Sequence, residues 1–434
     1  MSIPVVTVGQ SREDLVGGLE RLHGPVTVVR RCAELPELLA ACQSGLARAA
    51  VVAEGSEGLS ASLVDRLGAV GVAIIALTDN AEEADRLRRI GVASALTGIE
   101  SAELSDRIAD AVAQLTGGLR PASLSSLADT GAALATEPVV PGLDAEGSGA
   151  GELIVVWGPA GSPGRTTVAV NIAGEMAADG RAVLVVDADT YGASVAAVLG
   201  LLDESAGLAQ ACRLADQGLL DADALRKVAA TIATTAGTFR VLTGITRADR
   251  WTELRAPALA LVLERARQIA DVVVVDTGFC LEADEELSFD TMAPRRNAAT
   301  LRPLELADTV YAVGAADPVG VPRLVRALAE LEGAVPQASP TVIMNKVRSS
   351  SVGRAPERQL RDAWERYGPA SGLKAFLPYD PTAADAALLA GSLLLEASPD
   401  SALRHSIREL VCAPDQRKAK SSVFSSTPRR RAKD

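Results

Sequence analysis

Short, almost purely aliphatic runs are the feature of this sequence that most constrains its fold. The stretches ELIVVWG (152–158), AVLVVDAD (182–189) and DVVVVDTG (271–278) are apolar at consecutive positions and end in Gly or Asp. A strand that is apolar at every position is covered on both faces, which is typical of a parallel sheet between helices. The runs TVYAVGA (309–315) and PTVIMNKV (340–347) continue the pattern. They predict an α/β fold with a mainly parallel sheet.

A stretch rich in Gly, Ser, Ala and Pro at residues 117–150 divides the chain, and this composition predicts a flexible linker. The 434 residues are enough for two domains. We expect one domain at residues 1–116 and a second at 151–412. The polar, basic stretch 413–434 should be a disordered tail.

Five short apolar runs alternate with helical patterns in the first domain, at 4–9, 25–29, 49–54, 72–78 and 93–98. Strands interleaved with helices in this way predict a doubly wound, flavodoxin-like domain. The order of elements resembles that of response-regulator receiver domains.

The residues that carry receiver chemistry are mostly absent. That family has an Asp at the end of the third strand, an acidic pair after the first and a Lys after the fifth. Here the corresponding positions hold Glu54, Gly9-Gln10 and Leu96-Thr97-Gly98, and only Thr78 matches. We expect a structural pseudo-receiver that serves in docking, with a live phosphoacceptor as the alternative.

The run at 152–158 leads into GPAGSPGRTT (158–167) and then into the helical pattern TTVAVNIAGEMAADG (166–180). A loop at a strand–helix junction presents backbone N–H groups to phosphate, and the helix dipole favours an anion there. Glycine lets the backbone approach an anion closely. In this loop Arg165 would supply a cation, and the Thr166 hydroxyl would bind Mg²⁺. The predicted phosphate-binding residues are Gly161, Ser162, Gly164, Arg165, Thr166 and Thr167.

This loop resembles the deviant Walker A motif of MinD/ParA ATPases, KGGxGK[ST]T. The resemblance continues through Asp187-Ala-Asp189 and a Walker B pattern ending in Asp276, in the family's order along the chain. The loop departs from the motif in having Arg165 in place of the catalytic Lys and Ala160 in place of the upstream signature Lys. Prolines 159 and 163 also remove two N–H donors.

The resemblance implies roles for the acids and for two later positions. Asp187 lies near Mg²⁺ and Asp276 holds it, while Asp189 orients the attacking water. Asn345 matches an Asn that contacts adenine, and Pro378 matches the "xPxDP" loop that packs on the base. The alternative for the acids is that they cap helices or turns at strand ends.

A receiver-like domain without its phosphoacceptor, followed by a MinD-like ATPase, resembles CpaE/TadZ proteins, which position Flp/Tad pilus machinery. GPAGSPGRTT and LPYDPTAADAALLAG resemble an actinobacterial branch that includes septum-site-determining proteins. The resemblance implies ATP and Mg²⁺ as cofactors, a homodimer, and protein partners in septum or pilus machinery. Slow hydrolysis and a hydrolysis-deficient scaffold remain alternatives. A ParA-type DNA-segregation role is less favoured, because the net charge is −12 and no helix-turn-helix pattern precedes the loop.

Five dispersed cysteines, no signal-peptide pattern and no apolar run of about 18–20 residues predict a cytoplasmic protein. We expect it in the cytoplasm or at the periphery of the membrane, cell pole or septum. The basic tail is interpreted as solvated, with weak contact to anionic lipid as the alternative. The charged stretch 281–300 is either a solvated loop or a partner-binding segment.

Overall fold

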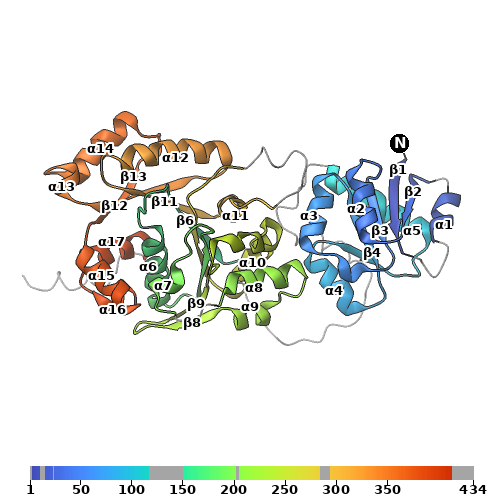
Figure 1. Cartoon of the computed structure of the whole chain (residues 1–434), viewed down its shortest axis with the longest axis horizontal. Coiled ribbons are helices and arrows are strands. Elements are labelled where there is room, and N and C mark those ends of the chain that lie inside the picture. Colours follow the sequence, from blue (N-terminus) through green and yellow to red (C-terminus); the bar gives the residue numbers. More distant parts are fainter. Residues whose placement is uncertain are drawn as a thin grey trace, which may run out of the picture.

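The computed structural model describes residues 2–9, 15–22, 24–116, 150–201, 205–283 and 294–412. It confirms the predicted fold class, since the chain forms two α/β units, each built around a mainly parallel sheet (Figure 1). The predicted tail and all of the predicted linker except Ala150 lie outside the described residues.

The first unit holds a five-stranded parallel sheet in the order β2-β1-β3-β4-β5. This is the flavodoxin-like order, which receiver domains share. Its elements are β1 (Ile3–Val8), α1 (Leu15–Arg21), β2 (Val26–Cys32), α2 (Leu35–Gln43), β3 (Ala49–Val52), η1 (Ser56–Gly58), α3 (Ala61–Ala69), β4 (Ala73–Leu77), α4 (Ala81–Arg89), β5 (Ala93–Ala95) and α5 (Ser101–Thr116).

Both faces of this sheet are covered, as the apolar runs predict. In β1 the side chains of Val6 and Val8 pack with α2, α3 and α4, whereas Val5 packs with α1 and α5. The strand β3 ends at Val52, two residues before the predicted end, because Gly55 (φ 78°) turns the chain into η1.

The second unit holds an eight-stranded sheet in the order β13-β12-β11-β6-β10-β7-β9-β8. Its elements are β6 (Glu152–Trp157), α6 (Arg165–Ala178), β7 (Val183–Ala188), α7 (Val195–Val198), α8 (Gly207–Asp216), α9 (Ala222–Val228), β8 (Ala230–Ala233), β9 (Thr238–Leu242), η4 (Ala248–Glu253), α10 (Ala256–Ile269), β10 (Val272–Thr277), α11 (Ala298–Leu306), β11 (Thr309–Ala315), α12 (Gly320–Ala334), β12 (Pro340–Val347), α13 (Ser349–Val352), α14 (Pro356–Tyr367), β13 (Leu373–Pro378), α15 (Pro381–Ala390), α16 (Leu394–Ala397) and α17 (Ala402–Val411).

All neighbouring strands of this sheet are parallel except β8, which runs antiparallel to β9. In the central strand β6, Leu153, Val155 and Trp157 pack with α8, α10 and α12, whereas Ile154 and Val156 pack with α6 and α17. The sequence did not predict β8, β9 or β13. They lie toward the edges of the sheet, and their partly exposed polar positions interrupt the aliphatic pattern.

The carboxyl end of α8 is held between α3 and α4 of the first unit. The Asp216 carboxylate accepts hydrogen bonds from the Ser62 N–H (2.8 Å) and hydroxyl (2.6 Å) at the start of α3. In return, Arg86 and Arg89 of α4 donate to the carbonyls of the two residues after α8 (3.1 and 3.2 Å). An anion at one helix start and cations at another helix end complement both helix dipoles.

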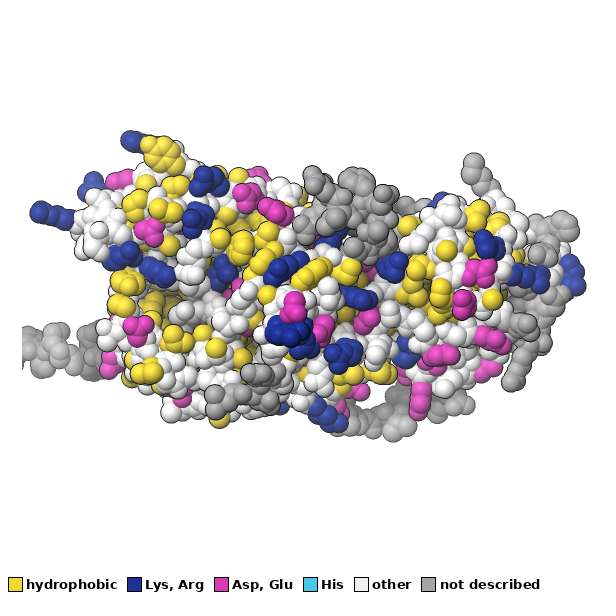
Figure 2. Space-filling view, viewed as in Figure 1, with side chains coloured by type: hydrophobic (Ala, Val, Ile, Leu, Met, Phe, Trp, Pro, Cys, Tyr) yellow, Lys and Arg dark blue, Asp and Glu magenta, His cyan; other side chains and the backbone are white. Residues whose placement is uncertain are grey.

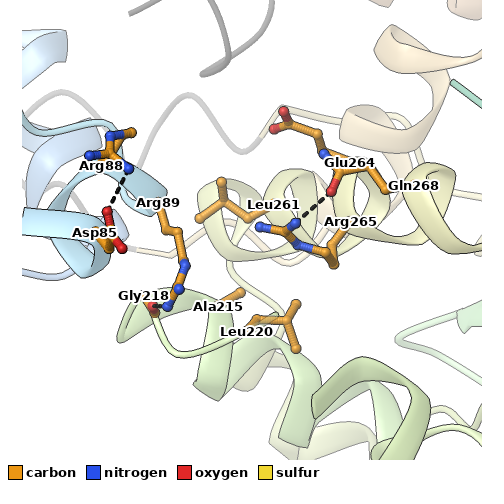
Figure 3. Close-up of a pocket in the computed structure, with 10 residues that line it drawn as sticks. All are labelled: Asp85, Arg88, Arg89, Ala215, Gly218, Leu220, Leu261, Glu264, Arg265 and Gln268. Atoms are coloured by element: carbon orange, nitrogen blue, oxygen red, sulfur yellow. Dashed lines mark hydrogen bonds and ion pairs between the residues drawn. The ribbon is translucent and has the colours of Figure 1, made fainter. Parts of the chain in front are cut away.

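A pocket of about 280 Å³ lies at this junction, between α4 and α10. Figure 3 shows the residues that line it. Its guanidinium groups have partners, since Arg88 is paired with Asp85 (2.6 Å) and Arg265 donates to Gln268 (2.5 Å). On the face of the molecule in Figure 2, Lys and Arg side chains are interspersed with Asp and Glu. None of the described helices is both long and apolar enough to span a bilayer.

Candidate functional site

The predicted phosphate loop joins the central strand β6 to the helix α6, at the carboxyl edge of the second sheet. Gly161 and Gly164 have φ angles of 105° and 101°, in the left-handed region that glycine adopts without strain. Gly164 is the N-cap of α6 and provides no side-chain cap. The helix begins here with its first N–H groups uncapped, and the Val168 N–H is the first to donate back, to the Gly164 carbonyl (3.0 Å). A helix start of this kind favours an anion, because its first N–H groups have no partner within the helix.

Two aspartates lie side by side at the carboxyl ends of β7 and β10. Asp187 and Asp276 are register partners, and each is only 1% exposed. The Thr166 hydroxyl donates to Asp276 Oδ2 (2.6 Å) and lies 3.1 Å from the Ser194 hydroxyl. The other carboxylate oxygen of Asp276 is buried without a hydrogen-bond partner. The predicted metal-binding residues are thus brought together beside the loop.

Burial makes the charged forms of these two acids costly. It raises the pKa of Asp187 to about 7, although the Val195 N–H opposes the shift. Burial, followed by the charge of Asp187, raises the pKa of Asp276 well above its ordinary value. A divalent cation would offset the cost of two buried carboxylates.

The donor set fits Mg²⁺ in combination with a nucleotide. A hydroxyl and carboxylates are the hard oxygen ligands that Mg²⁺ prefers, usually with phosphate oxygens and water completing the shell. Within the described ranges, no three or more His, Cys, Asp or Glu side chains form a metal-binding group. Two carboxylates and one hydroxyl leave positions in the shell of a cation that phosphate oxygens and water would fill.

The predicted catalytic residues, Arg165 and Asp189, are also in contact. The Arg165 guanidinium donates to the carbonyls of Gly158 (3.0 Å) and Pro159 (3.2 Å) and forms an ion pair with Asp189 (3.2 Å). The second carboxylate oxygen of Asp189 accepts the Tyr191 N–H (2.8 Å). The Arg165 side chain is therefore folded back onto its own loop. Phosphates would compete with these acceptors for its guanidinium group.

The structure brings Asn345 to the loop but leaves Pro378 one strand further out. Asn345 is 7% exposed, and its Nδ2 donates to the Pro163 carbonyl (2.8 Å) while its Oδ1 accepts the Lys346 N–H (2.7 Å). Pro378 pairs with Val347 at the end of β13 and does not line the pocket of about 100 Å³ beside the loop. Ser162 (φ 52°) and Thr167 lie in the loop and in the first turn of α6, as predicted.

Contacts between the segments that follow β7 and β10 were not predicted. The Tyr191 hydroxyl donates to Asn297 (2.7 Å). Arg296 donates to the Thr190 carbonyl (2.6 Å), and its guanidinium lies 3.9 Å from the centre of the Tyr191 ring. Arg296 was grouped with the charged stretch 281–300, of which residues 284–293 lie outside the described part. The spacing of charges gave no signal that this arginine packs against the segment after Asp189.

The comparisons with known proteins agree with this geometry. The family described as the CobQ/CobB/MinD/ParA nucleotide binding domain matches residues 154–390, more than half of the 434-residue chain. No curated protein matches the chain significantly.

Among solved structures, a ParA family ATPase from Chlorobium tepidum is 17% identical with a TM-score of 0.50, covering 60% of this chain and 99% of its own. The cell division ATPase MinD of Pyrococcus furiosus is 20% identical with a TM-score of 0.47, covering 60% and 97%. The septum site-determining protein MinD of Pyrococcus horikoshii, complexed with Mg-ADP, is 18% identical with a TM-score of 0.46, covering 60% and 94%. On the family match and the geometry of its loop, this chain belongs to the CobQ/CobB/MinD/ParA nucleotide-binding family.

Proposed function

We propose that this protein binds ATP with Mg²⁺ at the loop 158–167 and uses the nucleotide state to regulate where other proteins assemble. The observation that carries the proposal is the unpartnered, buried oxygen of Asp276 beside Asp187 and the Thr166 hydroxyl. An orphaned carboxylate oxygen at the open start of α6 is where a phosphate-bound cation would be held.

Each residue of the site then has a role. The N–H groups of Gly161, Gly164 and the first turn of α6 bind the phosphates, and Arg165 neutralises their charge. Thr166, Asp187 and Asp276 would hold Mg²⁺, which neutralises charge between the phosphates. Asp189 orients the water that attacks the terminal phosphate. Asn345 and Pro378 are proposed on the adenine side.

We propose that hydrolysis is slow. The ion pair between Arg165 and Asp189 engages the two groups on which turnover depends, and a nucleotide must separate them. The same contact favours a second candidate, a nucleotide-binding scaffold that has lost turnover.

The cellular role rests on the family and on the CpaE/TadZ-like order of domains. We propose a nucleotide-controlled homodimer in the cytoplasm or at the membrane periphery, with protein partners in septum or pilus machinery. The proposed domains are 1–116 and 151–412, with a linker and a tail at 117–150 and 413–434. Localising a tagged copy, and reading whether septum or pilus genes flank its gene, distinguishes the two processes.

Calorimetry with ATP and a non-hydrolysable analogue, beside a phosphate-release assay, tests the binding proposal. We expect Mg²⁺-dependent binding in the micromolar to millimolar range and slow release of phosphate. Binding without release favours the scaffold. The absence of a binding signal for both nucleotides in the presence of Mg²⁺ would refute both candidates.

A further inference from the structure

Three carbonyls of the phosphate loop accept hydrogen bonds from side chains outside the loop. Arg323 of α12 donates to the Ala160 carbonyl (3.0 Å), Lys346 to the Ser162 carbonyl (2.7 Å), and Asn345 to the Pro163 carbonyl (2.8 Å). No motif of the sequence marks Arg323, which also lines the small pocket beside the loop.

Because of peptide geometry, these hydrogen bonds also fix the direction of the neighbouring backbone N–H groups. In a trans peptide the C=O of one residue and the N–H of the next point in opposite directions, and the described residues contain no cis peptide. A carbonyl held by an outside side chain therefore directs the following N–H away from that side chain. The residues that follow Ala160 and Pro163 are Gly161 and Gly164. The residue that follows Ser162 is a proline, which has no N–H.

Two further observations single out these glycines. Among the described residues, neither the Gly161 nor the Gly164 N–H has a protein acceptor. A Cβ on Gly161 would lie 2.2 Å from Arg323 Nη1, and a Cβ on Gly164 would lie 2.4 Å from Asn345 Nδ2. A side chain at either glycine would therefore displace the group that holds the preceding carbonyl.

We propose that Arg323 and Asn345 are positioning residues that turn the N–H groups of Gly161 and Gly164 toward the phosphates of the nucleotide. This proposal rests on the proposed ATP site. The guanidinium of Arg323 also polarises the peptide it binds, which strengthens the adjoining N–H as a donor to an anion. It brings positive charge to the backbone at Ala160, where the side chain carries none. Lys346 contributes charge alone, because no donor follows its carbonyl.

The test for Arg323 compares Arg323→Gln with Arg326→Gln, which removes the same charge from the exposed side of α12. Binding of MgATP, MgADP and adenosine is measured by calorimetry. We expect Arg323→Gln to weaken MgATP about tenfold, the size expected for one charge-assisted contact. It should weaken MgADP less and leave adenosine unchanged, while Arg326→Gln stays within about twofold of the wild type. Arg323→Lys should recover part of the loss.

For Asn345 the positioning role would replace the contact with adenine that the family resemblance implies, and Asn345→Ala separates the two. Positioning predicts a loss for MgATP and none for adenosine, whereas contact with the base predicts equal losses for both. Equal effects of Arg323→Gln and Arg326→Gln on MgATP, or losses at Arg323 and Asn345 that extend equally to adenosine, would overturn the proposal. If the wild type binds no nucleotide, the proposed function itself has failed. Unfolding midpoints without nucleotide should not change in the Arg323 variants. A contact that only stabilises the fold would instead lower the midpoint when it is removed.

Discussion

The carboxyl edges of the two parallel sheets differ in where they keep their acids. In the first sheet the acid is Glu54, which lies two residues after the end of β3 and has an exposed side chain. A Cβ on Gly9 would lie 2.6 Å from Glu54 Cβ, so the backbone that follows β1 lies close against Glu54. In the second sheet Asp187 and Asp276 are 1% exposed and lie beside an open helix start.

The difference shows that the layered architecture alone does not make a site. Both sheets have helices on both faces and strand ends at one edge, yet among the residues that the structure describes only the second edge combines buried carboxylates with free backbone donors. A buried carboxylate needs a compensating partner, whereas an exposed one is already solvated by water. We therefore expect substitutions at the second edge to change nucleotide binding and matched substitutions at the first edge to leave it unchanged.

The largest effect should come from removing one buried charge. Asp276→Asn is expected to weaken MgATP binding about a hundredfold, because a metal-binding carboxylate is lost. Glu54→Gln at the first edge should have no effect. Calorimetry with Mg²⁺ and with EDTA measures both variants. A similar loss in Glu54→Gln, or no loss in Asp276→Asn, would remove the distinction between the edges.

The next effect concerns two glycines that both lie in the left-handed region but have different surroundings. Gly164 and Gly55 both have positive φ, but an added Cβ meets Asn345 at Gly164 and nothing within 4 Å at Gly55. We expect Gly164→Ala to cost about 2–3 kcal/mol of unfolding free energy, and Gly55→Ala about 1 kcal/mol, which is the backbone strain alone. Denaturant unfolding measures both, and equal costs would show that the Asn345 contact is dispensable.

The residues that form the second edge were not equally predictable from the sequence. The five strands of the first sheet, five of the eight strands of the second sheet and the loop were predicted, because aliphatic runs, glycines and strand-end acids are local patterns. Arg323, Tyr191 and Asn297 carry no local pattern, because their roles depend on tertiary contacts between distant segments. The antiparallel strand β8 was missed for a related reason, since an edge strand with alternating exposure lacks the continuous apolar signal.

A third prediction separates turnover from binding at the second edge. Asp189→Asn should lower the rate of ATP hydrolysis at least about tenfold while MgATP binds as well as before or better, because Arg165 is released for the phosphates. Asp79→Asn, at the first edge, should leave both unchanged. Phosphate release and calorimetry are the measurements. If Asp189→Asn weakens binding as much as turnover, the Arg165–Asp189 ion pair does not oppose the nucleotide.

The smallest effect is expected where the two units meet. Asp216→Ala removes the acceptor at the start of α3 and should cost about 1 kcal/mol of unfolding free energy, with MgATP affinity within about twofold of the wild type. Asp223→Ala, at the start of α9, provides an exposed control. A large loss of MgATP affinity in Asp216→Ala would show that the first unit takes part in binding.

The central claim is that the metal and the phosphates lie at the carboxyl edge of the second sheet. The most direct measurement is a crystal structure with Mn²⁺ and a non-hydrolysable ATP analogue, in which anomalous scattering locates the metal. We predict one peak between the Thr166 hydroxyl and the Asp276 carboxylate, with the phosphates on the N–H groups of the loop 158–167. A peak at the first sheet beside Glu54, or an analogue bound away from this loop, would contradict the account.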